Sequence, residues 1–236
     1  MENKKEVAYS GLVLNGFVAI VLFLALLALT IRLFVQADKD AIFALFGTLG
    51  MLLTALCAKG FIKLEPNEAK VLVFFGKYSG TFTRTGFYWV NPLLSKKSVS
   101  LRARNLNPEP IKVNDKAGNP VLIGMVLVWK LEDTYKALFE IDSQSLAGTP
   151  ASGGNAARSL SHAFENFVRV QSDAALRQVA GFYAYDNAAS EDELTLRSNA
   201  EEINEQLVRT LNDRLSMAGI HVTEARINYL AYAPEI

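Results

Sequence analysis

Few side chains in this chain could perform acid–base, nucleophilic or metal chemistry. The 236 residues include two histidines, His162 and His221, and one cysteine, Cys57. The histidines are far apart in the sequence, and neither has neighbours at the spacing of a metal site. Cys57 has no second cysteine with which to form an intramolecular disulfide, and it lies in an apolar run where a thiol behaves as a small apolar group. We therefore expect no metal site and no functional thiol.

The sequence also lacks the common nucleophile and phosphate motifs. Ser161 directly precedes His162, but adjacent side chains on a helix diverge, and no G-x-S-x-G motif accompanies them. The segment AGTPASGG, residues 147–154, lacks the lysine of a phosphate-binding loop and is interpreted as a flexible joint. We predict no catalytic residues, no cofactor and no enzymatic activity. A membrane-bound hydrolase that uses a serine and a lysine remains the alternative.

The net charge and the hydrophobic content limit the classes of protein to which this chain could belong. Lysine and arginine together number 24, as do aspartate and glutamate, so the formal net charge is zero. This balance provides no broad basic surface, and we expect no nucleic-acid partner. Half of the residues are hydrophobic, which is typical of a globular domain attached to a membrane.

Two uncharged apolar runs occupy residues 8–31 and 41–58. At 1.5 Å per residue they extend about 36 and 27 Å, against a bilayer hydrocarbon core of about 30 Å. The first run is too long to be the core of a signal peptide. We predict two transmembrane helices joined by residues 32–40. Asn15 is expected to be a tolerated polar residue or to hydrogen-bond to the second helix.

Basic residues flanking the two runs predict the sidedness of this hairpin. Five lysines lie at its outer ends and two basic residues lie in its connector: Lys4, Lys5, Lys59, Lys63 and Lys70 against Arg32 and Lys39. The positive-inside rule then places both outer ends in the cytoplasm. We expect an integral protein of a bacterial inner membrane with its domain facing the cytoplasm. A re-entrant hairpin would have the same sidedness, and an extracytoplasmic domain is the alternative orientation.

The run RTGFYWVNPLL, residues 84–94, places three adjacent aromatic residues between turn signals. It soon follows the second apolar run, so it stays near the bilayer, where Trp and Tyr favour the headgroup layer. We predict membrane contact by Phe87, Tyr88, Trp89, Leu93 and Leu94. The alternative is that Phe87, Trp89 and Leu93 belong to the protein core. A strand whose side chains alternate between its two faces would bury one face in protein and the other in lipid.

Strand patterns dominate the first part of the remaining chain. The strand-like runs are 69–75, 98–104, 111–113 and 121–131. The run 98–104 alternates with period two, and 121–131 is apolar on both faces and is expected at the centre of its sheet. Asp133 is expected to cap a short helix over 134–141.

Helical spacing dominates the second part. The expected helices cover 156–168, a segment from Ser172, and a long helix from Ser190 to Ala218 that Gly219 ends, before a final strand from residue 220. Glu193 completes a capping box with Ser190. Segregated strands and helices favour an α+β fold. The expected organisation is a membrane hairpin (1–60), a strand-rich half (61–146), the joint (147–154) and a helix-rich half (155–236).

Several stretches, in their order and spacing, resemble the stomatin/prohibitin/flotillin (SPFH, or band 7) family. They are LEPNEAKVLVFFGKYSGTFTRTGFYWVNPLL, VNDKAGNPVLIGMVLVWKLEDTYKALFEI, SDAALRQVAG and LRSNAEEINEQLVRTLNDRLSMAGIHVTEARINYLAYAPEI, which together cover most of residues 63–236. The segment GTPASGGNAARSLSHAFENF is longer and richer in Gly and Ala than the family leads us to expect. The family's Ala/Glu-rich coiled-coil tail is not found in the sequence.

The resemblance implies a membrane-anchored scaffold without catalytic residues. Family members assemble into large rings or cages that enclose a patch of bilayer, and they associate with membrane proteases or channels. We therefore expect a large homo- or hetero-oligomer with the lipid bilayer as a partner, and a membrane protease or channel as a further one. A channel or a channel-regulating membrane subunit is the remaining alternative, although the apolar runs lack the intramembrane charges that would line a pore.

The expected long helix carries charges of both signs opposite its apolar stripe. Such a face is commonly solvated, but it also suits head-to-tail packing of identical subunits, where an acid on one helix meets a base on the next. We predict an oligomer interface formed by Arg197, Glu201, Glu205, Arg209, Asp213 and Arg214.

Overall fold

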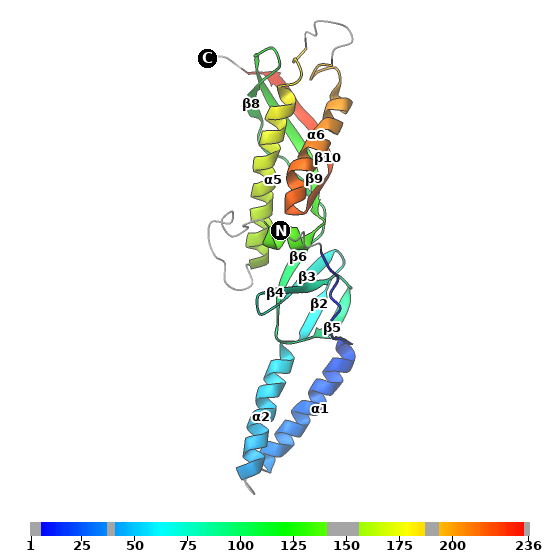
Figure 1. Ribbon diagram of the computed structural model, residues 1–236, viewed down its shortest axis with the longest axis vertical. Helices are drawn as coiled ribbons and strands as arrows, with labels where there is room; N and C mark the ends of the chain where they lie inside the picture. The colour runs from blue at the N-terminus through cyan, green and yellow to red at the C-terminus, as the bar shows by residue number, and fades with distance from the viewer. Residues whose placement is uncertain (1–5, 37–40, 141–155, 187–193, 234–236) are drawn as a thin grey trace. The chain divides into compact units, whose positions relative to one another are not determined.

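The computed structural model describes residues 6–36, 41–140, 156–186 and 194–233 (Figure 1). The chain forms two compact units, which we describe separately. One is Val7–Ser100, and the other comprises Glu6 and the described residues from Leu101 onward. The predicted joint at 147–154 lies outside the described residues, and the structure places the division after Ser100. The strand predicted over 98–104 is therefore wrong, because β6 (Leu94–Ser100) ends there and β7 (Arg104–Leu106) begins in the other unit.

The first unit contains an antiparallel hairpin of two apolar helices, α1 (Gly16–Val35) and α2 (Ala41–Ala58), which lie side by side (Figure 1). The 20 residues of α1 span about 30 Å, enough to cross a bilayer. Only 11% of an apolar 18-residue window of this helix is buried, unlike the core helix of a soluble protein. Among the described helices α1 is the one clear membrane-span candidate, and the apolar part of α2, Ile42–Ala58, is shorter.

The first helix begins eight residues later than the apolar run predicted. Thr81 donates its N–H to the Val7 carbonyl oxygen at 2.8 Å, and Tyr9 donates to the Thr81 carbonyl oxygen at 3.0 Å. Residues Val13–Asn15 form strand β1, which pairs with β5 (Gly86–Val90). Asn15 is the helix N-cap, because its side-chain oxygen accepts the Phe17 N–H at 2.9 Å. Ala8 and Tyr9 pair with Thr81, and Val13–Asn15 pair with β5. Apolar composition alone cannot distinguish that role from a membrane span.

The described residues of this unit also form six strands. Strand β5 lies between β1 and β2 (Phe61–Leu64), and β3 (Glu68–Phe74) lies between β4 (Lys77–Phe82) and β6. The strand predicted over 69–75 is confirmed to within one residue. The core of the unit comprises Ile62, Leu64, Leu72, Phe82, Val90 and Leu94.

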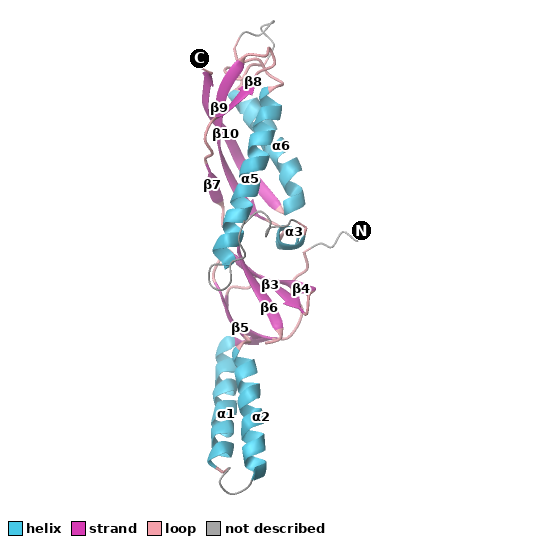
Figure 2. Ribbon diagram, turned by 90° about the vertical axis from the view of Figure 1, so that its left-hand side faces the viewer, coloured by secondary structure: helices cyan, strands magenta, loops and turns pink. Residues whose placement is uncertain are grey.

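The second unit is a sheet with helices over one face (Figure 2). Strand β9 (Pro120–Leu131) pairs with β10 (Ile220–Tyr232), β7 and β8 (Ile111–Asn114). Its central position confirms the prediction for 121–131, and its alternate side chains Val121, Ile123, Met125, Leu127 and Trp129 are all at most 1% exposed. The molecule is therefore α+β, as predicted.

The helices differ in part from the predicted boundaries. Asp133 caps α3 (Thr134–Phe139) by accepting the Lys136 N–H at 3.0 Å, as expected. The predicted helices before and after Ser172 are one helix, α5 (Ala156–Ala180), because no Gly or Pro interrupts it, and Ser172 is a buried mid-helix residue. The last helix, α6 (Ala200–Leu215), continues as the 3₁₀ turn η1 (Ser216–Ala218).

The structure confirms the predicted end of the long helix, whereas its predicted start lies outside the described residues. Ser190 and Glu193, the predicted capping box, lie outside the described residues. Arg197 precedes α6 in a turn and is not helical. Gly219 does end the segment, with a φ of +64° that favours glycine.

Two polar side chains tie distant segments of the second unit together. Asp115, in the turn between β8 and β9, accepts N–H groups from Ala117 and Asn119, at 2.9 and 2.7 Å, and from Tyr185 at 3.0 Å. Asn212 of α6 accepts the Val222 N–H at 2.8 Å and donates to the Val222 carbonyl oxygen at 3.0 Å. The two hydrogen bonds of Asn212 satisfy the backbone groups of Val222 on the edge strand β10.

Candidate functional site

The predicted aromatic membrane-contact residues lie where the helical hairpin meets the strands of its unit. Phe87 packs against the start of α1, since a Cβ added at Gly16 would lie 2.1 Å from its ring. The same ring is edge-on to Phe17 (centroids 5.8 Å apart) and stacked on Phe61 (5.6 Å). Strand β5 therefore places Phe87 between the start of α1 and β2, the strand that follows α2.

The neighbouring side chains of β5 have different surroundings. Trp89 is half-buried, and its Nε1 donates to the Cys57 carbonyl oxygen of α2 at 2.9 Å. Tyr88 is half-buried against the core, with its ring 5.2 Å from that of Phe82. Strand alternation thus directs Phe87 and Trp89 toward the hairpin and Tyr88 toward the protein core.

The two leucines after β5 also differ. Leu93 is 47% exposed. Leu94 is only 6% exposed and belongs to the core cluster. The structure thus contradicts membrane contact by Leu94, because Leu94 begins β6 on the face of the sheet that carries the buried Leu72.

An exposed apolar turn was missed by the sequence reasoning. Phe74 and Phe75 are 40% and 82% exposed at the tip of the β3–β4 hairpin. The sequence predicts an apolar strand over 69–75 that the turn GKYSG closes, but not the exposure of Phe74 and Phe75. The Phe-Gly pair before Lys77 was the available turn signal.

Several lysines surround this end of the unit. Lys59 and Lys77 are exposed, and Lys96 donates to the Lys59 carbonyl oxygen. Burial lowers the pKa of the Lys96 ammonium, and the nearby positive charge of Lys70 lowers it further. The end of α2 is therefore a local concentration of positive charge.

The serine and the two histidines considered for catalysis or metal binding do not come together in one site. Ser161 accepts a hydrogen bond from the Arg104 guanidinium, which is not a catalytic base. Each histidine lies 3.9 Å from a single carboxylate, His162 from Glu165 and His221 from Glu132. Within the described part of the chain, no three His, Cys, Asp or Glu residues gather as potential metal ligands.

The predicted interface residues lie on and beside α6, but the structure separates them. Arg197 pairs with Asp186 at 4.0 Å. Arg214 points toward α5 and donates to the Gln178 side-chain oxygen at 2.6 Å. Both are therefore engaged within the unit.

The remaining predicted residues keep an outward charged face on α6. Glu201, Glu205 and Asp213 are exposed, and Arg209 lies 3.4 Å from Glu205. Opposite them, α6 buries Ile203, Leu207, Leu211 and Leu215 against its own unit.

A shallow groove of about 400 Å³ runs between α6 and β10. One wall carries Glu201, Glu205 and Arg209, and the other carries Glu224 and Arg226. Arg226 pairs with Glu224 at 2.5 Å. The groove contains acids and bases on both walls, and three of the predicted interface residues line it.

Residues 62–236 match the SPFH domain / Band 7 family. The chain belongs to this family. No curated protein matches the chain closely enough to be named as a relative. The SPFH match begins in β2, directly after the hairpin, and therefore covers β2–β6 and the second unit.

Membership in the SPFH family bears on the general class of this protein. The family is generally of a non-enzymatic scaffold type, and a membrane scaffold role is consistent with it. The apolar helix α1 lies outside the matched residues and connects to the SPFH domain through β1 and β5.

Proposed function

We propose that this protein is a membrane-anchored oligomeric scaffold of the SPFH type that organises a patch of bilayer and its partner proteins. The observation that supports this most directly is the connection between hairpin and domain. Strand β1 leads into α1, β2 follows α2, and both strands pair with β5. A hairpin built into the sheet in this way anchors the domain at the membrane surface.

The proposed anchor has both helices in the bilayer and both flanks on the same side. β1 and β2 flank the same strand, so the chain enters and leaves the hairpin at one end. Lys59 and Lys63 lie at this end and Arg32 at the far end of α1. The positive-inside rule then favours the cytoplasm of a bacterial cell. Labelling of a cysteine introduced at Lys63 by a membrane-impermeant maleimide in intact cells, with Cys57 replaced by Ser, would contradict this orientation.

The charged groove between α6 and β10 is the proposed contact between subunits. Acids and bases on both walls suit a head-to-tail contact with the charged surface of the next subunit, which closes into a ring when the rotation allows it. Tethering in a membrane also raises the effective concentration of subunits. Because the ion pairs are exposed, salt should weaken the assembly.

The size of the particle tests the scaffold function. Gently extracted protein at low salt should appear by electron microscopy as a large closed assembly, and a membrane protease or channel is the class of partner expected to co-purify. A monomer or dimer under these conditions would remove the main support for the proposal.

Charge reversal tests the proposed contact. Arg209→Glu should reduce the particle size without preventing membrane insertion, and Glu205→Arg added to it should restore part of the size by exchanging the two charges. Arg169→Glu is the control, because Arg169 lies exposed on α5 and outside the groove. Equal effects of the control and Arg209→Glu would exclude the groove.

A further inference from the structure

Strand β10 forms one edge of the sheet in the second unit, and two asparagines of α6 cover part of that edge. Asn212 bonds to both backbone groups of Val222. Asn204 accepts the Ile227 N–H at 3.0 Å. Each asparagine therefore stands where a neighbouring strand would otherwise bond. An uncovered edge strand is a template for pairing with another chain, and cover of this kind restricts where such pairing can occur.

This cover has a gap at Ala225. The Ile227 N–H faces away from β9, and no register shift separates Ala225 from Ile227, so the N–H and C=O of Ala225 face outward as well. On α6, the position one turn from each asparagine is Val208, which lines the groove beside Ala225 and has no hydrogen-bonding group. Among the described residues, no side chain bonds to the backbone of Ala225. One donor and one acceptor of the sheet edge are therefore open in the groove.

The open stretch has room for a short strand. Asn204 and Asn212 are about two helical turns apart on α6, or roughly 11 Å. A strand of four residues covers three steps of about 3.3 Å each, or about 10 Å. A partner strand of this length fits between the two asparagines, whereas a longer one would meet their side chains.

Strand β8 has this length and lies at the opposite edge of the same sheet. It comprises Ile111–Asn114 and pairs with the side of β9 that faces away from β10. The Pro120 carbonyl oxygen accepts the Ala233 N–H, so Leu122, two residues further along β9, also bonds toward β10. Lys112 is the partner of Leu122 on β8. The N–H and C=O of Lys112 therefore face away from β9 and out of the sheet.

The directions of the two edge strands suit a head-to-tail contact between copies. β8 and β10 are each antiparallel to β9, so they are parallel to each other. In a ring of many subunits, neighbouring copies differ by a small rotation, which keeps β8 of one copy roughly parallel to β10 of the next. Val113 would then lie beside Ala225, and both side chains are buried on the helix side of their sheets. In this register Ala225 bonds to the Lys112 carbonyl oxygen and the Asn114 N–H.

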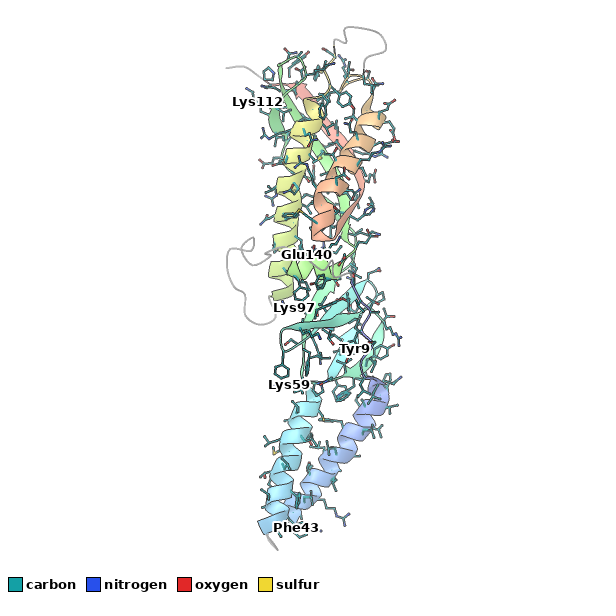
Figure 3. The ribbon with its side chains drawn as sticks, viewed as in Figure 1. Tyr9, Phe43, Lys59, Lys97, Lys112 and Glu140 are labelled. Atoms are coloured by element: carbon teal, nitrogen blue, oxygen red, sulfur yellow. The ribbon has the colours of Figure 1, made fainter. Side chains whose placement is uncertain are left out.

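Charges on the two edges are complementary. The groove beside β10 holds more acids than bases: Glu201, Glu205 and Glu224 against Arg209 and Arg226. Within the described part of the chain, Glu201 forms no ion pair. At the other edge Lys112 is exposed on β8 (Figure 3), and Arg177 of α5 donates to its carbonyl oxygen at 3.3 Å. Opposite charges on the two surfaces favour their association in one register.

We propose that subunits join through their sheets: β8 of one subunit occupies the groove of the next and pairs its backbone with Ala225. This inference rests on the proposed function, in which the groove is the contact between subunits. It adds the segment of the neighbour that fills the groove and the backbone groups that recognise it.

An engineered disulfide tests the pairing. Asn114 and Arg226 lie opposite each other in this register, at the spacing of paired strands, which is within the Cα–Cα range of about 4.4–6.8 Å for a disulfide. Because β9 separates β8 from β10 within one chain, a bridge must join two copies. The full chain with Cys57→Ser, Asn114→Cys and Arg226→Cys should form linked multimers in vesicles under mild oxidation.

The control for the disulfide combines Cys57→Ser and Arg226→Cys with Asn166→Cys, which is exposed on α5. This variant should form no linked copies. Absence of links from the Asn114→Cys variant, or equal links from the control, would overturn the proposal.

A third asparagine tests the gap. Val208→Asn places beside Ala225 a side chain like those of Asn204 and Asn212, so the chain should unfold at the same or a higher temperature. The groove should no longer accept β8, and the large particles should be lost. Val208→Ala leaves the gap open and should keep them. Large particles that persist in Val208→Asn would overturn the proposal. Loss of a co-purifying protein at unchanged particle size would instead assign the groove to a partner protein.

The scaffold proposal and this inference fail in different ways. Large particles that form no link between Asn114→Cys and Arg226→Cys would overturn the inference and leave the scaffold intact. Linked dimers without larger particles would support the pairing and overturn the scaffold.

Discussion

The indole Nε1 of Trp89 donates a 2.9 Å hydrogen bond to the main-chain carbonyl oxygen of Cys57, in the last turn of α2. The last carbonyls of a helix have no partner within the helix. Trp89 therefore joins strand β5 to the end of the hairpin by satisfying one of them. The Gly60 N–H donates to the same oxygen at 2.9 Å.

Replacing Trp89 with Phe should keep an aromatic ring at this junction and remove the hydrogen bond. We expect a loss of about 0.5–1.5 kcal/mol in the free energy of unfolding. Thermal unfolding in detergent, followed by circular dichroism, measures it. The control Tyr88→Phe removes only a 3.3 Å hydrogen bond from an exposed hydroxyl to Thr85 and should have a smaller effect. If the two substitutions cost the same, the indole hydrogen bond is not what secures the junction.

Gly16→Ala should destabilise the base of the hairpin. The new Cβ would lie 2.1 Å from Phe87 Cδ1, and the Phe87 ring is held between Phe17 and Phe61. Overpacking of this kind costs about 1–3 kcal/mol. Resistance of detergent-solubilised protein to heat and protease measures the change. Gly181→Ala is the control, because the nearest atom to its Cβ is at an ordinary 3.5 Å. No difference from the control would show that the ring moves aside freely.

Asn212→Ala should leave the Val222 N–H and carbonyl oxygen on β10 without their side-chain partner. Each buried group that loses its hydrogen bond costs about 1–3 kcal/mol. Denaturant unfolding of the full chain in detergent should show this loss. Asn212→Asp keeps the acceptor for the Val222 N–H and loses the donor, so its cost should be intermediate. An Asp variant as unstable as the Ala variant would contradict this division between the two hydrogen bonds.

Asp115→Asn should destabilise the second unit at neutral pH. Burial alone would raise the pKa of the Asp115 carboxyl, but hydrogen bonds from Asn119, Tyr185 and Ala117 lower it below the ordinary value of 3.8. An asparagine presents an amide N–H₂ to one of these donors, and we expect a loss of about 1–3 kcal/mol. Asp173→Asn, at a partly exposed position on α5, is the control.

The pH dependence of Asp115 has a defined sign. A carboxyl whose pKa is lower in the folded state stabilises the fold above its unfolded pKa, and the contribution disappears as the pH falls through the folded pKa. The difference in stability between the unsubstituted chain and Asp115→Asn should be constant at neutral pH and should shrink below about pH 4. A difference that shrinks between pH 8 and 6 would point to another group.

Features that depend on local composition could be predicted from the sequence. Strand β9 is apolar on both faces, which only a central strand requires, and Asp133 and Gly219 have the side chain and backbone freedom needed at helix ends. The ordered blocks of the family likewise identified the domain over residues 62–236. These signals lie within short segments, and tertiary contacts did not override them.

The tertiary structure decided which surface each apolar residue faces. Residues 8–15 are predicted to begin a membrane span, but Tyr9 pairs with Thr81 and Val13–Asn15 pair with β5. Leu93 and Leu94 are identical neighbours, yet only Leu94 is buried, because it begins a strand paired with Phe74. Phe74 and Phe75 are predicted to end an apolar strand, but Phe74 ends β3, Phe75 begins a two-residue turn, and both are exposed. Hydrophobicity measures how strongly a side chain avoids water, whereas long-range strand pairing determines whether protein or lipid replaces that water.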